Sequence, residues 1–200
     1  MNHFNKYTVM IEGYNQQIGK DDKAMKRSVL LLAVIIFFFY SCVQNVFLNQ
    51  DYRSFNKDPN SGWRKVAQEE GFAEAGDLID RYLKKHKDLG SSQTVNLNFH
   101  AGQMFAFANN YETALERFKN AKYDPEPEGI PIRWNAYVDS TIAFLKKDKI
   151  KLLECRNQIA NGPKISGKIP NLDVVDSLIK NFDKPYFEAY MAHRRRTKRR

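Results

Sequence analysis

Residues 95–125, VNLNFHAGQMFAFANNYETALERFKNAKYDP, decide the fold of this chain. Their apolar residues recur at helical spacing, which predicts one helix from about Gln93 to Ala108 and a second from Tyr111 to about Lys122. The dipeptide Asn109-Asn110 makes a short turn between them. Pro125 ends the second helix, because proline cannot continue one. The stretch therefore predicts two antiparallel helices joined by a tight turn.

Small and large side chains alternate along these two helices in a way that favours close packing. Small residues allow the backbones to approach, and aromatic rings fill the space around them. The small residues are Gly102, Ala114 and Ala121, and the aromatic residues are Phe105, Tyr111 and Phe118. With Ala101, these residues match the signature of a tetratricopeptide repeat (TPR) in type and order, so residues 95–125 resemble one such repeat.

The same pattern extends to both sides of this repeat. Phe72, Ala75, Ile79 and Tyr82 resemble the second helix of a preceding repeat, and residues 134–159 resemble a degenerate following repeat with Val138 at the glycine position. Two more helices are expected, one capped by Asn171 and one restarting after Pro185. The spacing differs from the family's, since 39 residues separate Phe72 from Tyr111 where the family has 34. The resemblance implies an all-α fold of stacked antiparallel helix pairs, a short TPR-like solenoid; a plain helical bundle is the alternative.

An apolar run precedes this body. Residues 29–40, VLLLAVIIFFFY, are uniformly apolar, and Lys23, Lys26 and Arg27 lie just before them. The run has the length of a signal-peptide core, and tolerating a few polar residues extends it to a span over 28–48. The positive flank predicts a cytoplasmic N-terminus and a body facing the periplasm or cell exterior.

Two interpretations of this segment remain open beside a buried soluble helix. Residues 25–42 resemble a bacterial lipoprotein signal peptide, which implies Met25 as the start, lipid attachment at Cys42 and cleavage before it. The departures are Phe39 and Tyr40, where an aliphatic and a small residue are usual. The other interpretation is an uncleaved signal anchor. The expected organisation is an N-terminal extension (1–27), a signal peptide or transmembrane anchor (28–48), a tether (49–62), the helical domain (63–193) and a disordered basic tail (194–200).

The net charge of +9 belongs to the ends of the chain. The last seven residues carry +6 and residues 1–27 carry +2, which leaves +1 for residues 28–193. The six cations of the tail are Arg194, Arg195, Arg196, Lys198, Arg199 and Arg200. Such a run is expected to be disordered and could bind anionic lipid or nucleic-acid phosphate. A body outside the cytoplasm makes nucleic acid an unfavoured partner.

The TPR resemblance implies a partner-binding groove lined by the first helix of each pair. The corresponding positions are Asn96, Phe99, Gln103, Ala106, Phe107, Arg133, Trp134 and Tyr137. Some members of the family clamp a peptide's terminal carboxylate with lysine and asparagine there. Phe99 and Gln103 replace those residues in this chain, so that ligand is not expected. Packing against the adjoining helix pair is the alternative role for all of these positions.

The sequence favours a protein that is not an enzyme. No glycine-rich phosphate loop, HExxH or GxSxG motif is present, and no two of the four histidines have metal-binding helical spacing. His100 and Cys155 could form a catalytic pair only if the fold brought them together. Glu126 and Glu128, in a proline-rich stretch, are expected at the surface. We therefore expect no cofactor, metal or small-molecule substrate, and a membrane-tethered scaffold that binds unidentified proteins of the cell envelope. A protein that binds nucleic acid or another anion through its basic tail is the alternative.

Overall fold

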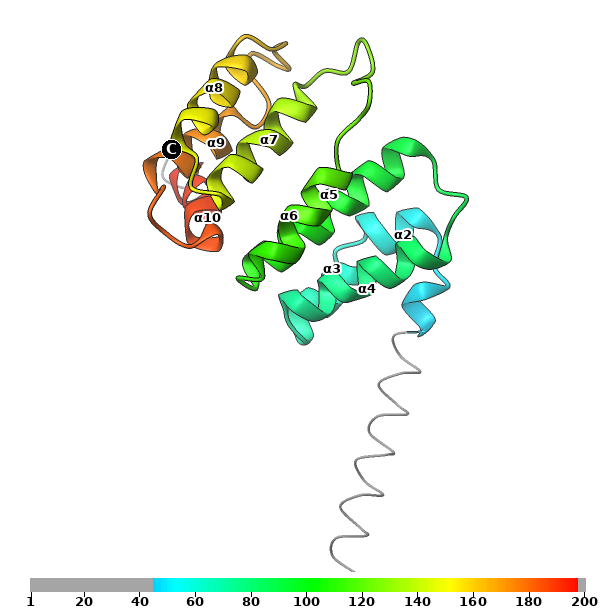
Figure 1. Cartoon of the computed structure of the whole chain (residues 1–200). Coiled ribbons are helices and arrows are strands. Elements are labelled where there is room, and N and C mark those ends of the chain that lie inside the picture. The colour runs from blue at the N-terminus through cyan, green and yellow to red at the C-terminus, as the bar shows by residue number, and fades with distance from the viewer. Residues whose placement is uncertain (1–44, 198–200) are drawn as a thin grey trace, which may run out of the picture. The chain divides into compact units, whose positions relative to one another are not determined.

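The computed structural model describes residues 45–197, which are all-α as predicted (Figure 1). Within this range the helices are α2 (Tyr52–Lys57), α3 (Gly62–Glu69), α4 (Phe72–Lys85), α5 (Ser91–Phe107), α6 (Tyr111–Asn120), α7 (Trp134–Leu145), α8 (Lys149–Ala160), α9 (Leu172–Lys180) and α10 (Tyr186–Thr197). Extended pairing in the described range is confined to the bridge between Ile165 and Lys168. Successive helices pack side by side, most closely from α4 to α6 and between α7 and α8.

The predicted pair at the centre is confirmed as α5 and α6. The turn is made by Asn109 in the left-handed region (φ 62°), and the side chain of Asn110 accepts a hydrogen bond from the Thr113 N–H at 3.3 Å. Gly102 faces the ring of Phe118, and a Cβ atom at Gly102 would lie only 2.9 Å from it. The small residue is therefore required by the contact between the two helices, as the sequence indicated.

A second glycine extends this packing to α4. A Cβ atom at Gly76 would lie 2.9 Å from the ring of Phe105 on α5. Phe105 and Phe118 thus lie over glycines on different helices, and both rings are buried. The three helices α4, α5 and α6 consequently form one closely packed layer.

Helices α7 and α8 form the next pair along the chain, as predicted, but they pack without the glycine contact found between α5 and α6. Val138 is fully buried at the position that the sequence aligns with Gly102 of the α5–α6 pair. Asp148 caps the N-terminus of α8, and its carboxylate accepts a hydrogen bond from the Lys151 N–H at 2.9 Å. Asn171 precedes α9 as predicted, but its backbone is left-handed (φ 63°) and its side chain makes no capping hydrogen bond.

The expected tether over 49–62 is wrong. These residues include α2, whose first turn is capped by the carboxylate of Asp51. Phe55 is completely buried and stacks on Tyr82 with ring centroids 3.7 Å apart. The helix is only six residues long, too short for periodicity to reveal it. Phe47 and Leu48 are also buried in this core, so the helical body begins inside the range assigned to the anchor.

The remainder of the expected anchor, including Cys42, lies outside the described residues. Within residues 45–197, no helix is both long and apolar enough to cross a membrane.

The C-terminal boundary also differs from the prediction. Helix α10 continues to Thr197, so its regular backbone includes Arg194, Arg195 and Arg196 of the expected disordered tail. Its first turns are held by the buried side chains of Tyr186 and Ala189, which explains why the helix extends into the charged run. Lys198, Arg199 and Arg200 lie outside the described residues.

Candidate functional site

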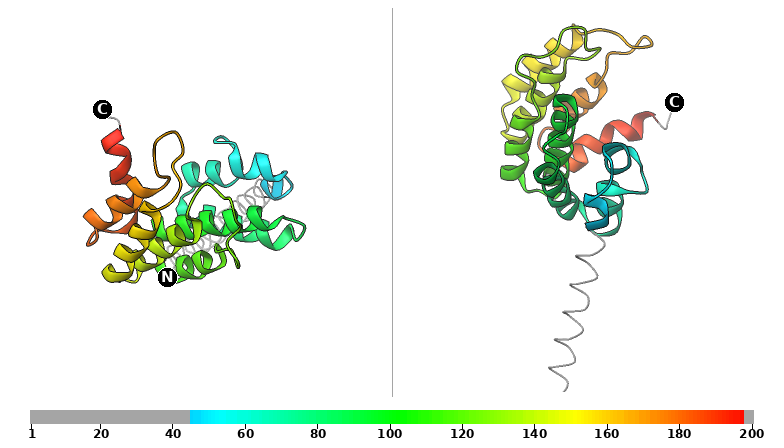
Figure 2. Two further views of the ribbon diagram at one scale, coloured as in Figure 1. Left: turned by 90° about the horizontal axis from the view of Figure 1, so that it is seen from above. Right: turned by 90° about the vertical axis from the view of Figure 1, so that its right-hand side faces the viewer.

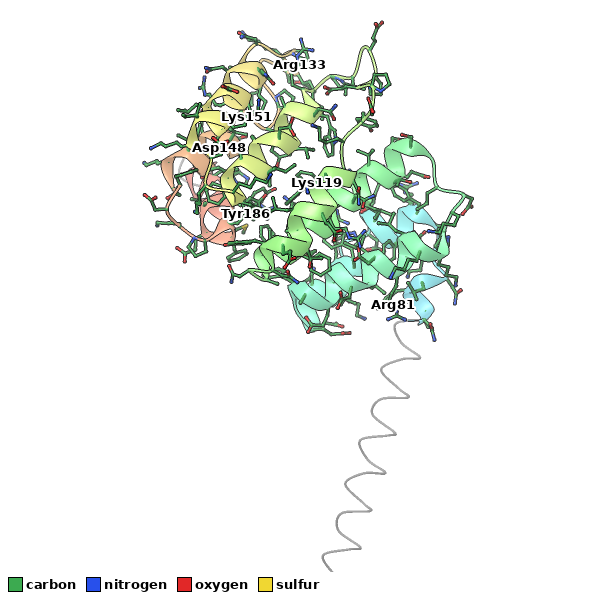
Figure 3. The ribbon with its side chains drawn as sticks, viewed as in Figure 1. Arg81, Lys119, Arg133, Asp148, Lys151 and Tyr186 are labelled. Atoms are coloured by element: carbon green, nitrogen blue, oxygen red, sulfur yellow. The ribbon has the colours of Figure 1, made fainter. Side chains whose placement is uncertain are left out.

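Helix α10 packs against the side of α5 on which the sequence places part of the binding groove (Figure 2). The ring centroid of Phe107 lies 5.6 Å from that of Tyr186 and 5.4 Å from that of Tyr190. Tyr186 lies at the start of α10 (Figure 3). Its backbone N–H donates a hydrogen bond to the Tyr111 hydroxyl at 3.2 Å, which joins α10 to α6. The chain's own last helix therefore covers part of the expected groove.

An open cavity of about 460 Å³ remains between α3, the start of α4, α5 and α10. We refer to it as the α3–α5–α10 cavity. Its aromatic lining comes from Trp63, Phe72, Phe107, Phe187 and Tyr190. Its polar and charged lining comes from Arg64, Gln68, His100, Gln103 and Arg194. Two predicted groove residues, Gln103 and Phe107, thus border a cavity that the other six do not.

Arg64 lies along the α3 wall of this cavity. Its guanidinium carbon lies 4.1 Å from the centroid of the Trp63 ring, within the range of a cation–π contact. The side chain is half-buried, and its buried Nη1 atom has no hydrogen-bond partner among the described residues. Burial is the main cause that lowers the pKa of the guanidinium, which nevertheless stays charged at neutral pH. The wall therefore carries a cation with incomplete hydrogen bonding.

His100 lies beside Arg64 at the base of the cavity. Its ring centroid is 4.9 Å from that of Trp63 and 6.2 Å from that of Phe99. Burial lowers the pKa of the imidazole to about 4, and the positive charge of Arg64 acts in the same direction. Its Nδ1 atom is buried without a hydrogen-bond partner among the described residues. At neutral pH the cavity therefore contains an uncharged imidazole with unused hydrogen-bonding capacity.

Asn96 and Trp134 border a different cavity, of about 570 Å³, between α2, the start of α5 and the connection before α7. The side-chain oxygen of Asn96 accepts hydrogen bonds from the Tyr52 hydroxyl at 3.2 Å and the Asn56 amide at 2.8 Å. The Trp134 indole N–H donates to the Ala121 carbonyl at 2.7 Å. Both predicted groove residues thus make structural hydrogen bonds within the chain.

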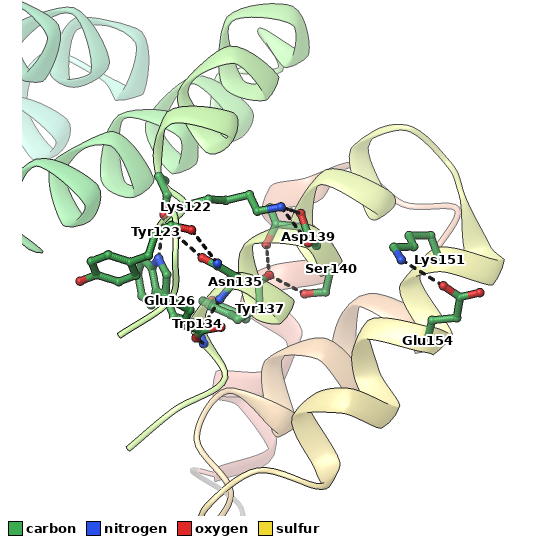
Figure 4. A network of polar contacts seen from close by, with 12 residues as sticks. Lys122, Tyr123, Glu126, Trp134, Asn135, Tyr137, Asp139, Ser140, Lys151 and Glu154 are labelled. Atoms are coloured by element: carbon green, nitrogen blue, oxygen red, sulfur yellow. Dashed lines mark hydrogen bonds and ion pairs between the residues drawn. The ribbon is translucent and has the colours of Figure 1, made fainter. Parts of the chain in front are cut away.

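The connection before α7 is fixed by a polar network (Figure 4). One carboxylate oxygen of Glu126 accepts hydrogen bonds from the backbone N–H groups of Trp134 at 2.6 Å and Asn135 at 3.3 Å. The Asn135 side chain exchanges two hydrogen bonds of 2.9 Å with the backbone of Tyr123. Glu126, expected to be a solvated surface residue, instead satisfies the first turn of α7.

The remaining predicted groove residues do not border the α3–α5–α10 cavity. Phe99 and Tyr137 are buried and their ring centroids are 5.2 Å apart, so they pack α5 against α7. Ala106 is fully buried. Arg133 is exposed beside Gly162, where an added Cβ atom would lie 2.9 Å from its Cγ. The structure therefore distributes the eight positions over two cavities, a packed interior and the surface.

The structure gives His100 and Cys155 separate surroundings. Cys155 is buried on α8, and burial, followed by the charge of Asp139, raises the pKa of its thiol. His100 contacts Trp63 and Phe99 at the α3–α5–α10 cavity. These contacts do not pair the imidazole with the thiol. The described residues also contain no group of three histidine, cysteine or acidic side chains that could hold a metal ion.

Sequence reasoning missed the residues that α3 and α10 contribute to the cavity. Trp63, Arg64, Phe187 and Tyr190 were not candidates, because nothing local shows that α10 returns to α5. The available signal was the concentration of aromatic residues at 186–190 directly before the basic run. Arg194, assigned to the tail, borders the cavity.

Comparisons with models of protein families, with curated proteins and with solved structures find no match for this chain.

Proposed function

We propose that the chain is a membrane-tethered, non-enzymatic interaction protein that binds a segment of a partner protein in the α3–α5–α10 cavity. The observation that carries this proposal is the cavity's composition. Aromatic side chains line a cavity of about 460 Å³, and two of its other lining residues, Arg64 and His100, each have a buried nitrogen without a hydrogen-bond partner among the described residues. Buried polar groups in proteins normally have hydrogen-bond partners, so unpaired ones beside an opening favour an external ligand.

The open edge of the cavity favours a peptide over a small molecule. Phe187 is 36% exposed on α10, although its ring centroid lies 5.2 Å from that of Phe107 and 5.4 Å from that of Phe72. Exposed aromatic residues beside a partly filled apolar surface are typical of protein-binding sites. The TPR-like arrangement of stacked helix pairs is part of this proposal, and it would present the cavity on the inner side of the stack.

The membrane tether in this proposal rests on the sequence. The apolar run 29–40 and the preceding basic residues support insertion with the helical body in the periplasm or outside the cell. Lipid attachment at Cys42 and an uncleaved anchor are both compatible with the tether. The tether would confine the cavity near a membrane and so raise the rate at which it meets other membrane-bound proteins.

Site-specific photo-crosslinking in intact cells tests the proposal. A photoreactive amino acid replaces Phe187 at the cavity or, as the control, Ile150, which is 75% exposed on α8 and away from the cavity. We expect the full-length protein in the membrane fraction to form a discrete adduct with another protein from position 187 only. Equal adducts from both positions, or none from 187, would contradict the proposed site. Release of the protein by high salt alone would contradict the apolar tether.

A further inference from the structure

We propose that the partner segment is acidic: a carboxylate pairs with the guanidinium of Arg64, and an adjoining large apolar side chain contacts the aromatic wall beside Phe187. This inference rests on the proposed function and adds the chemistry of the ligand. The position on α3 is not one at which the TPR resemblance places carboxylate-binding residues.

The charges around the cavity favour an anion. The lining contains the cation Arg64, which has no ion-pair partner among the described residues, and no aspartate or glutamate. Arg64 is partly desolvated by its position against Trp63. Removing a charge from water costs free energy that a nearby opposite charge can offset. A carboxylate entering this cavity would supply the opposite charge that its lining lacks.

Two other partly buried arginines each form an ion pair with an aspartate, which Arg64 does not. Arg117 lies 2.8 Å from a carboxylate oxygen of Asp80, and Arg156 lies 2.9 Å from one of Asp176. Both arginines are comparably shielded, with side chains 25% and 34% exposed. Arg64 forms no ion pair with any described residue. Its partner in the bound state therefore has to come from outside the described part of the chain.

The surroundings of Arg64 suit a carboxylate and disfavour a second cation. The cation–π contact with Trp63 restrains the guanidinium, which reduces the entropy lost when it forms two parallel hydrogen bonds to a carboxylate. His100 is uncharged at neutral pH, so it adds no positive charge that would repel Arg64. The apolar wall beside these groups would contact the residue next to the acidic one.

The experiment selects peptides from a displayed library of random twelve-residue sequences, using the full-length protein in detergent micelles. Parallel selections use Arg64→Gln, Arg64→Lys, Phe187→Ser and the control Arg53→Gln, which changes an exposed arginine on α2 that lines none of the described cavities. A selected peptide is then resynthesised with glutamate or glutamine, and with a free or amidated C-terminus. Fluorescence anisotropy gives the affinity of each form.

We expect the wild type and Arg53→Gln to enrich aspartate and glutamate. Arg64→Gln should weaken binding of the acidic peptide at least tenfold and leave the glutamine peptide within twofold. Arg64→Lys should retain part of the preference, which shows that the loss follows the charge and is not a failure to fold. The amidated and free forms identify whether a side-chain or a terminal carboxylate is bound.

Three results would overturn this inference. Peptides that depend on Phe187 without acidic preference would reject the carboxylate and leave the proposed binding site standing. An acidic preference that persists in Arg64→Gln would also reject the role of Arg64. If no selected peptide depends on Phe187, both the proposed site and its ligand chemistry fail.

Discussion

The two sides of α5 differ in how closely their neighbours pack against them. Toward α4 and α6, glycines lie under the rings of Phe105 and Phe118, and an added methyl group would be within 2.9 Å of a neighbouring ring. Toward α3 and α10, the same helix presents His100, Gln103 and Phe107 to a cavity of about 460 Å³. We call the first the packed side and the second the cavity side. Close packing stabilises the fold on one side, while the other retains incompletely bonded polar groups, and stability is commonly sacrificed at sites that bind.

Removing an aromatic ring from each side gives the largest expected contrast. Phe118 is completely buried on the packed side, so Phe118→Ala should lower the free energy of unfolding by about 3–5 kcal/mol. Phe187 is 36% exposed on the cavity side, so Phe187→Ala should cost less than about 1 kcal/mol. Urea unfolding followed by circular dichroism measures both. Comparable losses for the two variants would show that the cavity side is also a structural interior.

The packed side was predictable because its determinants are local. Gly102 and Phe118 belong to one stretch of 31 residues, and the turn between their helices is only a few residues long. The hydrophobic period and the small residues therefore indicated the same helix pair. Helix α2 offered no comparable local signal. Phe55 is its single buried aromatic residue, the helix is only six residues long, and hydrophobic periodicity cannot predict the contact of Phe55 with Tyr82.

The cavity side depends on contacts between distant parts of the sequence. Its α10 wall is placed partly by the hydrogen bond from Tyr186 to Tyr111, 75 residues away. A groove expected from repeat positions alone could not include a helix from the end of the chain. Gln103 and Phe107 were therefore identified, whereas Arg64 and Phe187 were not. Phe99 and Tyr137 were assigned to the groove because the sequence does not reveal which aromatic residues the neighbouring helices bury.

Adding one methyl group tests the packed side more finely. Alanine favours a helix over glycine by about 0.5–1 kcal/mol, but Gly102→Ala would press a Cβ atom against the Phe118 ring. Overpacking costs about 1–3 kcal/mol, so we expect a net loss of about 1–2 kcal/mol in the same unfolding measurement. The Phe118 ring has little room to move away, because its centroid lies only 5.3 Å from the centroid of the Phe99 ring.

A double variant separates this clash from other effects. If the ring of Phe118 is the obstacle, Phe118→Leu should cost less in the Gly102→Ala background than in the wild type, and the two changes should not be additive. Additive losses, or a stabilised Gly102→Ala protein, would mean that the close approach of α5 and α6 does not require glycine.

The contribution of His100 on the cavity side should depend on pH and should be lost only in acid. The folded-state pKa of His100 is about 4, below the ordinary value of 6.5, so the unfolded chain binds more protons between these two pH values. Stability from the neutral imidazole is complete above pH 6.5 and is lost as the pH falls toward 4. From pH 7 to 5 we expect His100 to remove about 1–2 kcal/mol from the free energy of unfolding.

Carboxylates elsewhere also titrate in acid, so the measurement compares the wild type with His100→Gln, which carries no imidazole, by urea unfolding at pH 7 and pH 5. The wild type should lose more stability than the variant at pH 5, and the difference between them should not change from pH 7 to 8.5. Equal losses would mean that burial does not lower the pKa of His100 in the folded protein. The cavity would then lack the desolvation that makes an unpaired Arg64 costly, and the case for an acidic ligand would weaken together with the contrast between the two sides of α5.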